Sequence, residues 1–163
     1  MYHGRVDEAS THFDTALKLN PADATARAIY GFHLTKIGQS NAACEQFSIA
    51  RALDPYEQSW GPWIRAKALY AMRDCTLGIE ELLRANYAIN DVRLWLAASY
   101  AQIGQLDDAR AQLNEFLDSA EREMPLFPGR KLECWLPFLD EQCNEPDDLH
   151  HFQQGLRLAW PGT

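Results

Sequence analysis

The sequence has no long apolar run. No stretch of its 163 residues approaches the ~20 apolar residues that a membrane-spanning helix needs. The segment that starts at Met1 also lacks the apolar core of a signal peptide, so we expect a cytoplasmic protein with no membrane partner. Basic residues are few as well, since 15 Lys and Arg stand against 23 Asp and Glu and give a net charge of −8. Because nucleic-acid binding needs clustered Lys and Arg, this charge argues against nucleic acid as a partner.

Catalytic motifs are absent too. The sequence contains no phosphate-binding glycine loop, no nucleophile elbow and no His-Glu-x-x-His motif. Its paired carboxylates, Glu80 with Glu81 and Asp107 with Asp108, are adjacent in sequence and therefore diverge on a helix. We predict no catalytic residues and no cofactor, and the chain is not expected to be an enzyme.

Cysteine spacing also argues against a metal site. The chain has four cysteines, Cys44, Cys75, Cys134 and Cys143. Without a secretion signal, we expect reduced and mostly buried thiols. Cys134 and Cys143 lie too far apart for the tight Cys-x-x-Cys spacing of structural zinc sites. The nearby His150 and His151 are adjacent, so on a helix they point ~100° apart. We therefore predict no metal.

What the sequence does have is an internal repeat. One set of five residues recurs 34 positions later: Gly4, Ala9, Phe13, Ala16 and Pro21 return as Gly38, Ala43, Phe47, Ala50 and Pro55. Apolar residues follow three- and four-residue steps within each copy, which is typical of amphipathic helices. A period of 34 residues is that of helix-turn-helix repeats.

This pattern resembles the tetratricopeptide repeat family over about residues 4–120. The resemblance implies an all-α fold, a right-handed α-solenoid of antiparallel helix pairs with a C-terminal helical cap. We divide residues 1–123 into repeats: a half repeat (4–21), a repeat (24–55), a degenerate repeat (58–87) and a repeat (90–121). Residues 124–163 form a loop and two capping helices, expected over 131–139 and 146–159.

The degenerate repeat departs from the pattern at two positions. Met72 stands where the period places glycine, and Leu77 where it places alanine. Its helices are expected over 60–72 and 77–86. Gly38 and Gly104 are two residues closer than twice the period, so we expect the loss in the turn between Asn86 and Asn90.

A narrower resemblance covers two segments near the C-terminus. Residues 94–109 and 146–156 resemble the last part of a bacterial group of signalling proteins that have a C-terminal tetratricopeptide region. Their N-terminal modules are class III adenylate or guanylate cyclase domains or winged-helix DNA-binding domains. No catalytic cyclase sequence is present in this chain, so no cyclase residue is carried over. The resemblance implies a regulatory tail.

The tetratricopeptide resemblance also nominates binding residues. In that family the first helices of successive repeats line the concave face, where a peptide or a partner domain binds. The matching positions are Thr25, Phe32 and Lys36, then Ser59, Ala66 and Tyr70, then Asp91, Ala98 and Gln102. Phe32 and Tyr70 are the expected aromatic anchors.

The first helix suggests an alternative function. Residues 4–21 match only the second helix of a repeat, so we expect an exposed apolar strip at Val6, Phe13 and Leu17. Such a strip predicts self-association as a dimer. The chain would then be a cis-acting dimerisation tail of a cyclase-like protein, with no external ligand.

Overall fold

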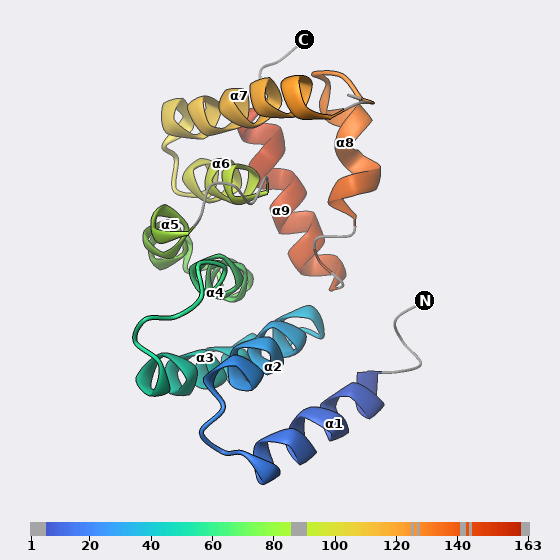
Figure 1. Ribbon diagram of the computed structural model, residues 1–163. Coiled ribbons are helices and arrows are strands. Elements are labelled where there is room, and N and C mark those ends of the chain that lie inside the picture. The colour runs from blue at the N-terminus through green and yellow to red at the C-terminus, as the bar shows by residue number, and fades with distance from the viewer. Residues whose placement is uncertain are drawn as a thin grey trace.

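A computed structural model describes residues 6–85, 91–124, 126, 128–140, 143 and 145–160, with the side chains of Val6 and Asp7 excepted. Every regular element in these residues is a helix (Figure 1). The helices are α1 (Val6–Leu19), α2 (Ala24–Lys36), α3 (Ser40–Leu53), α4 (Gly61–Ala71), α5 (Cys75–Arg84), α6 (Val92–Gln102), α7 (Leu106–Glu123), α8 (Leu132–Leu139) and α9 (Pro146–Ala159). Helices α2 and α3, α4 and α5, and α6 and α7 form the antiparallel pairs of an α-solenoid, which confirms the predicted fold.

Local sequence explains where the helices begin and end. Asp23 caps α2, because its side chain accepts a hydrogen bond from the Ala26 amide at 2.8 Å. Asp74 caps α5 in the same way through the Leu77 amide. Gly38 and Gly104 follow α2 and α6 with φ values of +76° and +80°, the left-handed conformation that ends a helix without a steric cost for glycine.

The degenerate repeat has a different register from the predicted one. Arg73 (φ +66°), and not Met72, takes the left-handed position of Gly38 and Gly104. The second helix of each pair then begins two residues later, at Ser40, Cys75 and Leu106. The alanine position of α3 therefore corresponds to the buried Gly78, so the assignments of Met72 and Leu77 are wrong by one residue. The proposed loss between Asn86 and Asn90 lies outside the described residues.

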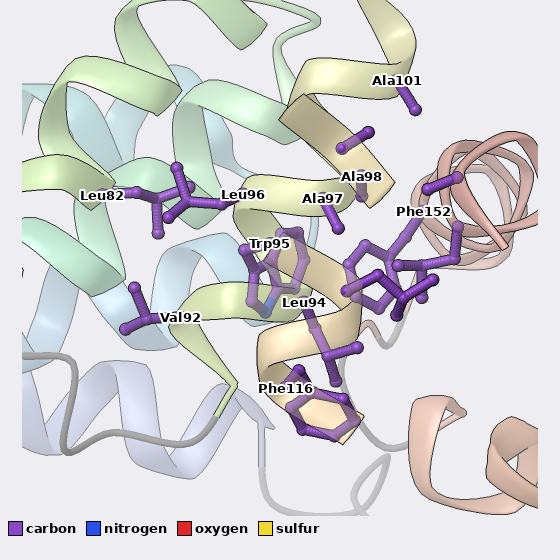
Figure 2. Close-up of a cluster of buried hydrophobic side chains, with 14 of the residues drawn as sticks. Leu82, Val92, Leu94, Trp95, Leu96, Ala97, Ala98, Ala101, Phe116 and Phe152 are labelled. Carbon is purple, nitrogen blue, oxygen red and sulfur yellow. The ribbon is translucent and has the colours of Figure 1, made fainter. Parts of the chain in front are cut away.

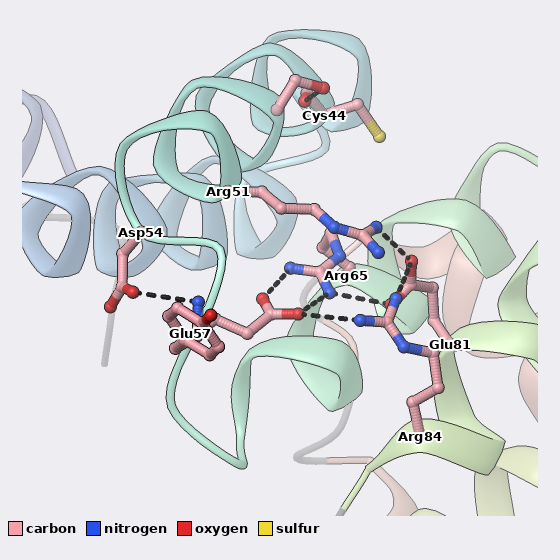
Figure 3. Close-up of polar contacts among 9 residues, drawn as sticks. Cys44, Arg51, Asp54, Glu57, Arg65, Glu81 and Arg84 are labelled. Atoms are coloured by element: carbon pink, nitrogen blue, oxygen red, sulfur yellow. Dashed lines mark hydrogen bonds and ion pairs between the residues drawn. The ribbon is translucent and has the colours of Figure 1, made fainter.

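The shifted register of the degenerate repeat arises from one extra residue in the connection between α3 and α4, since Arg73 follows Gly38 by 35 residues and not by 34. This connection is held by a network of charges around Arg65 of α4 (Figure 3). Its guanidinium Nη2 donates to Glu57 of the connection and to Glu81 of α5, both at 2.7 Å. Burial raises the pKa of Glu57, but the hydrogen bonds and charge of Arg65 outweigh burial and leave that pKa below its ordinary value.

Two hydrophobic clusters form the core. The smaller one joins α2, α3 and α4 through Leu34, Ala43, Phe47, Ile64 and Ala68. Here α2 and α3 approach closely: a Cβ on Gly31 would lie only 2.5 Å from the ring of Phe47, so the packing requires a glycine in the middle of α2. The larger cluster extends from α4 to α9, and Trp63 packs against both clusters.

The two predicted C-terminal helices form, but α9 lies along the inner face of the stack and not over its open end as a cap would. Helix α8 packs its Trp135 edge-on against Phe116 of α7, with ring centroids 4.9 Å apart. Helix α9 lies against α6 and α7 and buries Phe152, Leu156 and Ala159. Glu145 takes the position that precedes α9 and makes no side-chain capping hydrogen bond.

Candidate functional site

The inner face of the stack is formed by equivalent positions on α2, α4 and α6. Aligning the three helices on Gly38, Arg73 and Gly104 gives four rows of residues. Row one is Thr25, Trp60 and Asp91; row two is Ala28, Trp63 and Leu94; row three is Phe32, Lys67 and Ala98; row four is Lys36, Ala71 and Gln102.

Six of the nine nominated residues stand in these rows. They are the ones on α2 and α6: Thr25, Phe32, Lys36, Asp91, Ala98 and Gln102. The three nominated on α4, Ser59, Ala66 and Tyr70, are each one residue early, because the connection before α4 is one residue longer than the period allows. The row residues of α4 are Trp60, Lys67 and Ala71. Ala66 instead takes the place of Gly31 and is buried.

Helix α9 covers rows three and four at α6. The side-chain amide of Gln102 donates to the backbone carbonyl of His151 at 2.9 Å, and the Tyr70 hydroxyl donates to the same carbonyl at 3.1 Å. A Cβ on Gly155 would lie 2.8 Å from the carbonyl oxygen of Ala98, so the two helices nearly touch. Tyr70 and Ala98 are therefore buried under the chain's own helix and do not form an accessible surface.

An aromatic side chain anchors α9 on this face. Phe152 stacks on Trp95 of α6 with ring centroids 4.1 Å apart, and Tyr70 meets its edge at 6.0 Å. Figure 2 shows Phe152 projecting from α9 toward Trp95 and the alanines of α6. Nearer its start, α9 is tied to the stack by Arg73, which pairs with Asp148 at 2.9 Å. Tyr70, which was predicted to anchor a partner, instead contacts α9 of the same chain.

The segment before α9 reaches the end of α2. The Glu145 side chain packs on Gly38, so that an added Cβ would lie 2.8 Å from it. Phe32, Lys36, Cys143 and Glu145 line a small cavity at this junction. Burial raises the pKa of the Cys143 thiol to about 11, so the thiol is protonated and unreactive at neutral pH.

Row three contains a buried lysine that sequence reasoning missed. The Lys67 side chain is 5% exposed, and its ammonium lies 4.1 Å from the centre of the Trp63 ring and 5.0 Å from that of Trp95. It pairs with Asp91 at 3.0 Å. Burial lowers the pKa of Lys67, and the Asp91 charge opposes that shift. The sequence does contain an indication of this site, because Lys67 is the one lysine in the mostly apolar helix α4.

Rows one and two lie beside α9. Thr25 is exposed, and Ala28, Trp60, Trp63 and Asp91 are half-buried. At the α6 end of these rows, Leu94 lines a cavity of about 190 Å³ that α7 and α8 also enclose. These rows are therefore the part of the inner face that a partner can reach.

The nominated self-association residues are less exposed than predicted. Phe13 stacks on Tyr30 of α2 with ring centroids 5.0 Å apart, and Leu17 is half-buried. The hydroxyl of Ser10 lies 3.0 Å from the His33 ring, which adds a polar contact between α1 and α2. An exposed strip at Phe13 and Leu17 is therefore a wrong expectation. The side chain of Val6 lies outside the described residues.

The described residues contain no converging set of reactive groups. No three His, Cys, Asp or Glu side chains among them are grouped to hold a metal ion. All four cysteines are free; Cys75 is buried, Cys44 and Cys143 are half-buried, and Cys134 is exposed, contrary to the expectation for that thiol. No helix in the described part of the chain is both long and apolar enough to cross a membrane.

Comparison with known protein families identifies the repeat. A family model described as tetratricopeptide repeat matches residues 1–57 and 65–123, which is more than half of the chain. No curated protein matches the sequence.

Proposed function

Because the chain belongs to the tetratricopeptide repeat family, whose repeats generally bind other proteins and are generally non-catalytic, we propose that it binds a partner protein on its inner face. The bound segment lies along rows one and two, beside α9. Thr25, Ala28, Trp60, Trp63 and Asp91 contact it. This position keeps Thr25 and Asp91 of the nine predicted concave-face residues and leaves out the other seven, among them Tyr70 and Ala98, which α9 covers.

The observation that supports this proposal is the way α9 itself is held. One aromatic anchor on Trp95, two hydrogen bonds from Tyr70 and Gln102 to a helix carbonyl, and one ion pair with Arg73 fix α9 on the inner face. These are the elements by which grooves bind an amphipathic helix. Rows one and two offer a comparable aromatic surface in the half-buried Trp60 and Trp63, beside the ion pair of Asp91 with Lys67.

Peptide selection on the intact chain tests this proposal. Peptides from a random library are selected on residues 1–163, and their Kd values are measured by calorimetry for the wild type and two variants. Thr25→Arg places a bulky charge in row one and should weaken binding at least about tenfold. Thr76→Arg makes the same change at the second residue of α5, also exposed, and should leave Kd within about twofold. Equal affinities for both variants would contradict the proposal.

The resemblance to bacterial signalling proteins supports a narrower version of this function. In that version the chain is a regulatory tail, and partner binding controls an N-terminal catalytic or DNA-binding module. The test attaches the chain to such a module and asks whether a selected peptide changes the module's activity. An unchanged activity at saturating peptide would leave the binding function but remove the regulatory one.

One observation favours self-association as a second candidate. Ala16 of α1 is exposed, whereas its repeat equivalent Ala50 of α3 is buried between two helices. Leu19 at the end of α1 is 83% exposed. A second copy that packs on this face would make the chain a cis-acting dimerisation tail. Light scattering should then show a dimer that Ala16→Arg dissociates and Thr15→Arg does not, whereas a monomer at all concentrations would exclude it.

A further inference from the structure

We propose that the cavity at the α6 end of rows one and two holds one large apolar side chain of the partner, aromatic by preference, with Lys or Arg beside it. This proposal rests on the proposed function and names the chemistry of the partner. The cavity lies between the start of α6, the end of α7 and α8, and its walls include Leu94, Phe116, Met124, Trp135 and Phe138.

The volume suits a single side chain. A cavity of 150 Å³ with apolar walls accepts benzene, and this one is about 190 Å³. Sites for small molecules are larger, about 300–1,000 Å³, because they must bury most of their ligand. The cavity is therefore too small for a typical metabolite or cofactor and large enough for one aromatic ring or one branched aliphatic side chain.

The walls suit an aromatic ring. Phe116 and Trp135 meet edge-to-face at 4.9 Å, and Trp135 and Phe138 are tilted at 5.8 Å. Phe138 is 50% exposed, so the lip of the cavity is apolar as well. On the neighbouring face of α6, Phe152 of α9 stacks on Trp95, the residue after Leu94. The α6 surface thus binds one aromatic anchor within the molecule and has a second site with similar walls.

The charges around the cavity favour a basic partner. Ser119, which lines the cavity, donates to Glu123 at 2.9 Å, and both ends of this bond lie near the surface. Arg93, another lining residue, lies 3.8 Å from Glu115, which is exposed. Asp91 lines the cavity as well, and one of its carboxylate oxygens pairs with Lys67. The rim therefore has more carboxylates than guanidinium groups, on a chain whose net charge is −8.

Capped tripeptides test, on the intact chain, both the preference for an aromatic side chain and the preference for basic residues beside it. The probes are Lys-Trp-Lys, Glu-Trp-Glu and Lys-Ala-Lys, each blocked at both ends, with free indole as a fourth. Binding is followed by NMR shifts of the methyl groups of Leu94 and Met124. We expect Lys-Trp-Lys to bind at least about tenfold more tightly than Glu-Trp-Glu at low salt, and Lys-Ala-Lys to leave both methyl groups unshifted.

Two variants test whether the probes bind in the cavity. Ser119→Trp fills it and should abolish the methyl shifts with every probe, whereas Asn114→Trp adds the same residue to an exposed position of α7 and should change nothing. Phe138→Ala removes only the exposed lip, so it leaves the fold intact and should weaken Lys-Trp-Lys about threefold. This second variant keeps the test valid if Ser119→Trp does not fold.

Three results would overturn the proposal. One is unchanged affinity in both Ser119→Trp and Phe138→Ala. Another is equal affinity for the two charged tryptophan peptides, which removes the basic partner. The third is indole binding as tightly as Lys-Trp-Lys, which makes the cavity a site for a small apolar molecule. If these results appear while Thr25→Arg still weakens the selected peptides, the proposed function stands and only this inference fails.

Discussion

The inner face has equivalent residues at α2 and at α6, yet a helix lies directly on it only at α6. The difference lies in row three. At α6 this row has Ala98, and the backbone of α9 comes so close that only glycine fits at position 155. At α2 the same row has Phe32, whose ring projects and leaves room only for the Glu145 side chain and a small cavity. A small residue in row three therefore selects a closely packed helix, and a large one keeps the surface available.

The α2 end and the α6 end of the stack also differ in the number of buried hydrophobic residues that pack there. The cluster that joins α2 and α3 to α4 has five buried residues, whereas the cluster from α4 to α9 has most of the remaining core. Because hydrophobic stabilisation follows buried apolar area, we expect the C-terminal half to be the more stable one.

Removing the anchor of α9 should have the largest effect. Phe152 is fully buried between Trp95 and Tyr70, so Phe152→Ala should cost about 3–5 kcal/mol of unfolding free energy. Urea unfolding followed by tryptophan fluorescence measures this cost. The control Phe138→Ala truncates a half-exposed ring of α8 and should cost less than about 1 kcal/mol. Similar costs for the two variants would mean that α9 is not anchored as described.

Exchanging the row-three residues tests the role of residue size. Ala98→Phe makes α6 resemble α2 and should cost about 1–3 kcal/mol, because a ring at this position displaces α9. Hydrogen exchange should then show faster amide exchange in α9 than in α7. The reciprocal change Phe32→Ala removes a half-buried ring that does not contact α9 backbone, and it should leave α9 protection unchanged. Faster exchange in α9 after Phe32→Ala would contradict this role.

Acid should weaken the packing of α9 on α6, because it protonates His151 of α9. The Gln102 amide donates to its ring Nδ1 at 3.1 Å, and burial, then Arg73 and His150, lower the pKa of His151 while Asp148 opposes them. The folded protein thus takes up a proton less readily than the unfolded chain, so stability is full above pH 6.5 and falls as the pH drops below it.

His33 lets the two ends be compared by pH. Burial also lowers the pKa of His33, which contacts Ser10 of α1 and Phe13. His151→Gln should remove the acid-dependent acceleration of amide exchange in α9, whereas His33→Gln should remove it in α1 and α2. Acid sensitivity of α9 that persists in His151→Gln would show that another group is responsible.

The smallest effect concerns the positive φ of Arg73. Arg73→Gly relieves about 1 kcal/mol of backbone strain and loses the half-exposed pair with Asp148, which contributes up to about 1 kcal/mol, so the net change should be a gain near 0.5 kcal/mol or less. Gly104→Ala is the matched control, since an added Cβ there meets no atom within 4 Å and only the backbone opposes it. It should cost about 1 kcal/mol in thermal or urea unfolding.

The sequence predicted the helices better than their register. The bounds of α9 agree with the predicted range 146–159, because Pro146 and the two aspartates after it mark its start and apolar residues at three- and four-residue steps continue to Ala159. The one-residue shift at α4 was not predictable from the period, since Arg73 occupies a left-handed position that normally indicates glycine. Trp60 and Lys67 were missed for the same reason.

The position of α9 on the inner face was the other feature that the sequence could not show. Its apolar stripe of Phe152, Leu156 and Ala159 predicts burial, but a stripe does not identify the surface that buries it. Gly155 was the available indication, because a glycine within a helix often marks a close approach to another backbone. The cavity beside Leu94 depends on where α8 docks, which follows from tertiary packing alone.

Helix α9 also affects the mechanics of the stack. Its start packs on Gly38 after α2, its first turns pair with Arg73 after α4, and its middle is hydrogen-bonded to Gln102 of α6, so it crosses three successive repeats (Figure 1). A helical stack without such a crossing can change its curvature at every interface between repeats, because each repeat contacts only its neighbours. With α9 in place, bending requires these contacts to break together. We therefore expect α9 to restrict changes in the curvature of the stack from α2 to α6.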